Sequence, residues 1–180
     1  MSIEFHEQQK FTQPWLWLIV VGVASLALYG AYQQIVLGLP FGNQPMSTPA
    51  LLVFCLSMLG AVALFGTMQL TTDIDDDVIR MTFVPFVKRH ISWSEIKRIE
   101  VVNYGFVGGW GIRPWTRYGT VYNVRGQHGL AVELLNGKKL LIGTQKADRL
   151  ASVVQQKREQ LDATPSDQAS AKIRGANKTP

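Results

Sequence analysis

The chain has 180 residues, with 18 Lys and Arg against 13 Asp and Glu, which gives a formal net charge of +5. This length suits one domain of ordinary size with additional segments and argues against two full globular domains. The single cysteine, Cys55, excludes an intrachain disulfide framework and a thiolate-rich metal site.

The region from Phe11 to Thr72 contains no Asp, Glu, Lys or Arg, and two long apolar segments lie within it. We expect residues 1–14 to form a cytoplasmic N-terminal tail and residues 15–70 a transmembrane helical hairpin, with spans at about 15–37 and 50–70. Roughly 20 helical residues cross a hydrocarbon core about 30 Å thick. A cleaved signal peptide is the alternative for the first span, but Glu4 and Glu7 in the leader oppose it.

The basic residues around the spans predict the orientation of the hairpin. Lys10 precedes the first span, and Arg80, Lys88 and Arg89 follow the second, whereas residues 38–49 between the spans carry no charge. Because basic residues favour the cytoplasmic side, we expect both termini to be cytoplasmic.

Residues 71–161 are expected to form one soluble domain. Short apolar segments broken by turn residues are typical of β-strands. The predicted strands are residues 68–74, 78–84, 87–91, 96–103, 120–125, 130–135 and 139–144. Asn136-Gly137 predicts a hairpin with a type I′ turn.

An amphipathic helix over residues 147–161 is expected to close the domain, with Leu150, Val153, Val154 and Leu161 at helical spacing. Residues 162–180 lack apolar periodicity, which predicts a disordered tail. Six or seven strands and one C-terminal helix describe a mainly-β, pleckstrin-homology-like (PH-like) barrel closed by a helix.

Three motifs strengthen this interpretation: Ile91-Ser92-Trp93-Ser94-Glu95-Ile96, Gly109-Trp110-Gly111-Ile112-Arg113, and Gly137-Lys138-Lys139 followed by residues 141–145. Through them the chain resembles a family of small, uncharacterised bacterial membrane proteins with two spans and a cytoplasmic PH-like domain. The resemblance covers roughly residues 15–160 and implies a multi-pass protein of the bacterial inner membrane. It implies no activity, because PH-like domains have many unrelated roles.

The sequence contains no set of residues that predicts catalysis. His6, His90 and His128 are isolated from one another and from carboxylates at metal-ligand spacing. The Asp73–Asp77 cluster lacks the Gly and Glu that a calcium-binding EF-hand loop requires, so we expect a solvated β-turn there. We therefore expect no enzyme activity, no cofactor and no metal.

The segment 104–119, rich in glycine and aromatic residues, is the most unusual part of the soluble domain and is expected to be a long loop. One interpretation is that its rings fill the end of the barrel. The other is that they enter the headgroup layer while arginines meet anionic lipid. The candidate lipid or partner contacts are Trp110, Arg113, Trp115 and Arg117, together with Lys88 and Arg89 outside the loop.

The leading functional hypothesis is a non-enzymatic, membrane-anchored PH-like module that mediates protein or lipid contacts at the inner face of the bacterial membrane. The alternative is an accessory or regulatory subunit of a larger membrane protein complex. The expected partners are membrane lipids, anionic ones in particular, or a membrane protein. Nucleic-acid binding is not expected, since the basic residues form no recognised motif.

Overall fold

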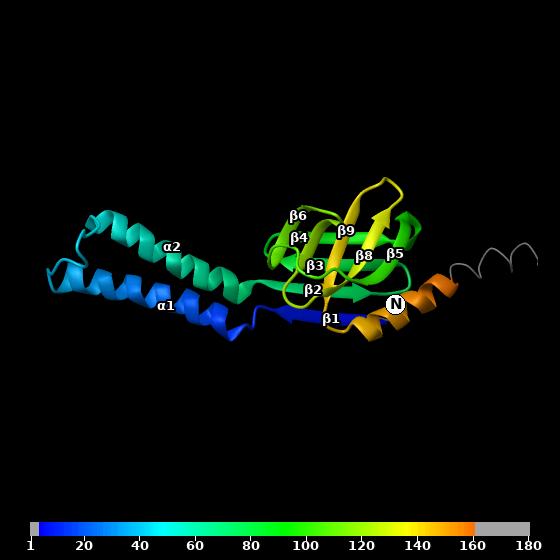
Figure 1. Cartoon of the computed structure of the whole chain (residues 1–180), viewed down its shortest axis with the longest axis horizontal. Coiled ribbons are helices and arrows are strands. Elements are labelled where there is room, and N and C mark those ends of the chain that lie inside the picture. The colour runs from blue at the N-terminus through cyan, green and yellow to red at the C-terminus, as the bar shows by residue number, and fades with distance from the viewer. Residues whose placement is uncertain (1–3, 161–180) are drawn as a thin grey trace, which may run out of the picture. The chain divides into compact units, whose positions relative to one another are not determined.

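The computed structural model describes residues 4–160, which form two compact units. One unit contains residues 10–69, and the other contains residues 4–9 and 70–160. Figure 1 shows their elements in chain order.

The first unit is a hairpin of two apolar helices. α1 (Pro14–Ala31) continues as a short π-helix, η1 (Tyr32–Val36), and α2 is Thr48–Thr67. Proline at the start of each helix fits a position whose N–H has no helical partner. Residues 14–36 and 48–67 are long and apolar enough to cross a membrane.

Small side chains let α1 and α2 approach each other closely. Ala27, Leu51 and Cys55 form a buried cluster, and the Cys55 Sγ–H donates to the Ala27 carbonyl at 3.3 Å. At the other end of the hairpin, the rings of Phe11 and Phe65 meet edge to face, with their centroids 5.8 Å apart.

The N-terminal segment is not simply a tail, in contrast to the expectation for residues 1–14. Phe5–Lys10 forms strand β1, and β1 is an edge strand of a sheet built mainly from residues after the second helix. The soluble domain therefore includes residues from both sides of the helical hairpin.

This first sheet has the order β1-β2-β3-β4, where β2 is Gln69–Ile74, β3 is Val78–Val84 and β4 is Val87–Ser92. β3 and β4 are antiparallel, with Phe83 opposite Val87. Alternate residues of β2 and β3 are buried, as expected for a sheet with one covered face. The buried side chains are Leu70, Thr72, Ile74, Ile79, Met81 and Phe83.

The second sheet has the order β5-β8-β9-β7-β6. Its strands are β5 (Ile96–Asn103), β6 (Gly111–Thr116), β7 (Gly119–Asn123), β8 (His128–Leu134) and β9 (Lys139–Thr144). β7 and β9 run parallel, and the other neighbouring pairs of this sheet are antiparallel. A 3₁₀ turn at Trp93–Glu95 connects the two sheets.

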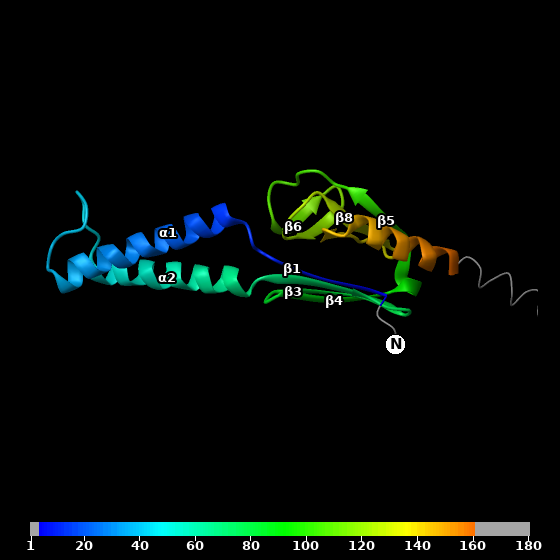
Figure 2. The same ribbon diagram turned by 90° about the horizontal axis from the view of Figure 1, so that it is seen from below.

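The two sheets lie as layers of one domain (Figure 2), and apolar residues of both sheets are buried. The expectation of a mainly-β domain is confirmed, but within residues 4–160 the strands form two open sheets rather than one closed barrel. The predicted strands at 78–84, 96–103 and 139–144 have the observed bounds, whereas β1 and β6 were not predicted.

The Asn136-Gly137 hairpin is confirmed, but its turn is not type I′. A type I′ turn needs positive φ at both central residues, and Trp115 is the one non-glycine described residue with positive φ. The Gly137 N–H donates to the Leu134 carbonyl at 2.9 Å and so closes a turn over residues 134–137. Gly137, the last residue of this turn, has φ 80°. The connection is therefore a longer loop in which the glycine alone has the left-handed conformation.

The predicted C-terminal helix is confirmed over residues 147–160, while residue 161 and the predicted tail at 162–180 lie outside the described residues. Leu150 and Val154 are buried as expected. Lys157, which the helical pattern places among the polar residues, is only 4% exposed and forms ion pairs with Glu4 and Asp76. Burial would lower the pKa of Lys157, but the hydrogen bonds to Asp76 and Glu4 raise it.

Candidate functional site

Buried polar side chains attach β1 to the second sheet. The Glu7 carboxylate accepts hydrogen bonds from the Thr144 hydroxyl and from the Gln145 N–H, the latter at 2.8 Å. The Gln9 side-chain amide donates to the Gly143 carbonyl at 2.8 Å. Glu7 and Gln9 are both buried, so these contacts hold β1 to the end of β9.

The segment 104–119 is not one long loop, because its second half contains strand β6. Its first half, residues 104–110, packs on the second sheet. Tyr104 belongs to a buried cluster with Val121 and Leu141, and its hydroxyl donates to the Gly126 carbonyl at 3.2 Å. Burial raises the pKa of Tyr104, although a hydrogen bond from Asn123 opposes the shift. Tyr104 is therefore part of the core, whereas Phe106 in the same half is 76% exposed.

Trp110 and Arg113 are partly buried at the β6 end of this packed segment. The Arg113 guanidinium lies against Gly109, where an added Cβ would come within 2.3 Å of a guanidinium nitrogen. Gly109 also has φ 129°, a conformation that favours glycine. Of the two interpretations of the loop, these residues favour packing within the domain.

Trp115 is the most exposed aromatic residue of the segment, ahead of Phe106. It is 96% exposed and has φ 58°, the left-handed region that non-glycine residues rarely adopt. Arg117, also exposed, lies over the Tyr118 ring at 4.7 Å from the ring centroid. The turn between β6 and β7 therefore presents a tryptophan and an arginine together to the surroundings.

The six predicted contact residues do not form one patch. The six residues of strand β6 lie between Trp110 and Arg117. Lys88 and Arg89 are both exposed on the edge strand β4, but Lys88 is opposite Thr82 and Arg89 is opposite the buried Met81. Since successive strand residues point to opposite faces, the two cations face different directions.

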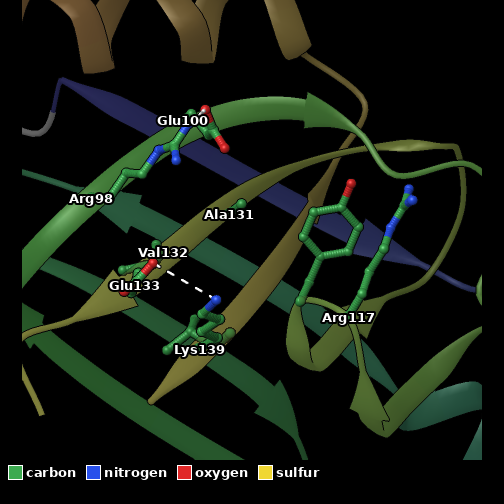
Figure 3. Close-up of a pocket in the computed structure, with 9 residues that line it drawn as sticks. Arg98, Glu100, Arg117, Ala131, Val132, Glu133 and Lys139 are labelled. Carbon is green, nitrogen blue, oxygen red and sulfur yellow. Dashed lines mark hydrogen bonds and ion pairs between the residues drawn. The ribbon is translucent and has the colours of Figure 1, made fainter. Parts of the chain in front are cut away.

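A shallow groove of about 170 Å³ lies beside the β6–β7 turn (Figure 3). Arg117 and Tyr118 line one side, and charged side chains of β5, β8 and β9 line the other. These charged residues are Arg98, Glu100, Glu133 and Lys139. Local sequence patterns do not indicate these four residues, because their placement in one groove depends on strand order.

Ion pairs order the charged wall of this groove. Lys97 donates to Glu133 at 2.9 Å, Lys139 lies 3.9 Å from the same carboxylate, and Arg98 pairs with Glu100 at 3.1 Å. The hydrogen bond from Lys97 is the largest cause that lowers the pKa of Glu133. The wall thus offers both charge signs, which suits a polar partner surface better than a uniformly anionic one.

Within residues 4–160, no group of three or more His, Cys, Asp and Glu side chains could hold a metal ion. The aspartate cluster is a structured turn, in which Asp75 Oδ1 accepts hydrogen bonds from the backbone N–H groups of Asp77 and Val78. Asp75 is buried, in contrast to the expected solvated turn, and pairs with Arg80 at 2.7 Å. Asp73 and Asp76 also form ion pairs, with His6 and Lys157 respectively.

Comparison with known proteins adds no family assignment. No protein-family model matches the chain, and no curated protein matches it significantly.

Proposed function

We propose that this chain is a non-enzymatic, membrane-anchored PH-like module that mediates contacts at the inner face of a bacterial membrane. Two apolar helices of membrane-spanning length support the anchor. The contact role is supported by the β6–β7 turn, and the PH-like assignment by the mainly-β architecture with a C-terminal helix.

The pairing of β1 with β2 supports a single location for the whole soluble domain. Three residues separate the end of β1 at Lys10 from α1, and one residue separates the end of α2 from β2. Two neighbouring strands of one sheet must lie on the same side of a bilayer. If both helices cross, α1 therefore starts and α2 ends at the domain's side, which agrees with the charge-based expectation that both termini lie on one side.

Trp115 is the observation that carries the contact role. Its side chain gains almost no burial within the domain, and its positive φ costs about 1–2 kcal/mol for a non-glycine residue. Trp, Tyr and Arg are the residues that most often dominate the free energy of protein–protein binding, and residues 115–118 contain all three.

The mixed charges of the adjoining groove favour a protein partner at this surface. Arg117 adds a positive charge to those of Arg98 and Lys139. Glu100 and Glu133 offer carboxylate oxygens that can accept hydrogen bonds from a partner's N–H groups and pair with its cations. A bound segment with an apolar side chain for Trp115 and an acidic side chain for Arg117 would fit this arrangement.

Site-specific photo-crosslinking in native membranes tests this function. A benzophenone amino acid replaces Trp115 in the full chain, and the matched control replaces Leu135, which is exposed at the β8–β9 turn. We expect a discrete protein adduct from position 115 that weakens at least threefold with Arg117→Ala, and none from position 135. Equal adducts from both positions, or no adduct from position 115, would contradict a contact site at this turn.

The accessory-subunit alternative is favoured by the same exposed turn, because a permanent partner would cover Trp115. Purification in mild detergent separates the two functions. A large membrane protein in stoichiometric amount supports the accessory subunit, whereas the chain alone, with an adduct formed only in membranes, supports the independent module.

A further inference from the structure

The turn between β3 and β4 has an exposed apolar tip that the β6–β7 contact site does not use. Val84, Pro85, Phe86 and Val87 form this tip, and the Phe86 side chain is 54% exposed. The Phe86 N–H donates to the Phe83 carbonyl at 2.8 Å, which closes the turn, and the half-exposed Phe86 ring lies 6.4 Å from the ring of the buried Phe83, measured between centroids.

Strand directions place this tip at one defined end of the first sheet. The Glu4 N–H donates to the Ile74 carbonyl, and the Asp75 N–H donates to the Val78 carbonyl. The start of β1, the end of β2 and the start of β3 therefore lie together at one end of the sheet. The opposite end contains Lys10, Gln69 and the β3–β4 tip, and Figure 2 shows these strands side by side.

Lys10 and Gln69 are also where the chain leaves the sheet for the two apolar helices. Only Met68 lies between α2 and β2, and two residues reach at most about 7 Å. Adjacent strands are about 5 Å apart, so the tip lies within about 15 Å of the end of α2 whatever the angle between the two units.

The length of α2 fixes where that end lies in a bilayer. Its 20 residues extend about 30 Å, which is the full thickness of the hydrocarbon core. The end of α2 thus lies at the core boundary, and the headgroup layer beyond it is about 5–8 Å thick. An exposed aromatic ring tethered this closely has the headgroup layer within reach.

We propose that the β3–β4 tip is a second membrane contact, in which Phe86 enters the headgroup layer of the bilayer that holds α1 and α2. Lys88, exposed just beyond the tip, is positioned to meet lipid phosphate. This inference rests on the part of the proposed function in which both helices span the bilayer. It assigns the lipid contact to the sheet end next to the helices and leaves the β6–β7 turn for a protein partner.

Fluorescence quenching by spin-labelled lipid tests this contact in the full chain reconstituted in nanodiscs. Cys55→Ser removes the native thiol, and an environment-sensitive fluorophore is attached through Phe86→Cys. The matched control is Ser94→Cys, exposed at the opposite end of the same sheet, and Leu56→Cys reports on the exposed face of α2. Quenchers near the headgroups should reduce the signal at 86 at least about twofold more than at 94.

The reporters distinguish failure of the tip from failure of the anchor. Quenching at 56, with 86 no more quenched than 94, would overturn the tip contact and leave the spanning helices intact. No quenching at 56 by lipids labelled deep in the acyl chains would overturn the anchor itself, and the tip contact with it.

A second labelling position leaves Phe86 itself free to be substituted, so that the role of its side chain can be tested. With the fluorophore on Lys88→Cys, quenching should fall at least twofold in Phe86→Asp and stay unchanged in Phe86→Leu. Equal quenching in both variants would show that Phe86 does not hold the tip at the membrane and would overturn the proposal.

Discussion

Asp75 stabilises the turn between β2 and β3 through contacts that its charged form makes. Its carboxylate accepts two backbone N–H groups and pairs with Arg80. Burial alone would raise the pKa of Asp75, but these hydrogen bonds and the Arg80 guanidinium hold it below its usual value of 3.8. The unfolded chain therefore binds a proton more readily at this residue, so its contribution is present above about pH 4 and is lost as the pH falls through the folded pKa.

Asp75→Asn should lower the free energy of unfolding of the soluble domain by about 1–3 kcal/mol at neutral pH, because Arg80 loses its partner. The matched control, Asp77→Asn at an exposed position, should change it by less than about 0.5 kcal/mol. Thermal unfolding in detergent, followed by tryptophan fluorescence, measures both. The difference between wild type and Asp75→Asn should shrink below pH 4, and a difference that grows there would contradict the assigned pKa direction.

Trp115→Gly should raise the free energy of unfolding by about 0.5–1 kcal/mol, because glycine adopts positive φ without strain and an exposed ring loses little packing. Trp115→Ala retains the strain and should leave stability unchanged. The same thermal measurement applies. A loss of more than 1 kcal/mol with glycine would mean that Trp115 packs within the domain, which would remove the argument for a contact site.

Strand β1 determines which part of the chain an experiment on the soluble domain must include. It comes from before the helices, and its buried Glu7 and Gln9 contact the end of β9. A fragment beginning at residue 71 lacks this strand and leaves polar groups of β9 without partners.

Glu7→Ala should lower the free energy of unfolding by about 1–3 kcal/mol, because the Thr144 hydroxyl and the Gln145 N–H lose their buried acceptor. His6→Ala, on the exposed face of the same strand, should cost less than about 1 kcal/mol through its surface pair with Asp73. Hydrogen exchange in the full chain should show faster exchange at residues 143–146 in Glu7→Ala alone. Equal protection in both variants would exclude a role for Glu7 in holding β1.

The sequence predicted the elements whose signal is local. Alternating apolar residues defined β3, β5 and β9, and long apolar runs defined the two helices. β1 carries only Phe5 as a buried apolar residue, beside Glu7 and Gln9, and its partner strand β2 begins at residue 69, far along the chain. β6 contains Pro114, which opposes a strand prediction. β1 and β6 form strands because of their tertiary contacts, so local sequence patterns could not predict them.

The candidate site was predictable in part. The unusual composition of residues 104–119 pointed to Trp115 and Arg117, but composition could not separate them from the packed Trp110 and Arg113, since that depends on where β6 begins. Strand alternation alone could have separated Lys88 from Arg89. The groove with Arg98 and Lys139 could not be predicted, because it forms from strands that are adjacent only in space.

At the scale of the whole molecule, one constraint connects sheet and membrane. The helices lie between two neighbouring strands of one sheet, so a folded domain allows only an even number of crossings between Lys10 and Gln69. A single crossing would place β1 and β2 on opposite sides of the bilayer and separate Glu7 from Thr144.

The most direct test of this account is labelling of single cysteines by a membrane-impermeant maleimide in intact cells. Cys55→Ser provides the background, with Asn43→Cys between the helices and Ser94→Cys in the soluble domain. We predict labelling at 43 before permeabilisation and at 94 only afterwards. Labelling of both positions alike in intact cells, or of 94 alone, would contradict a hairpin that anchors a cytoplasmic contact module.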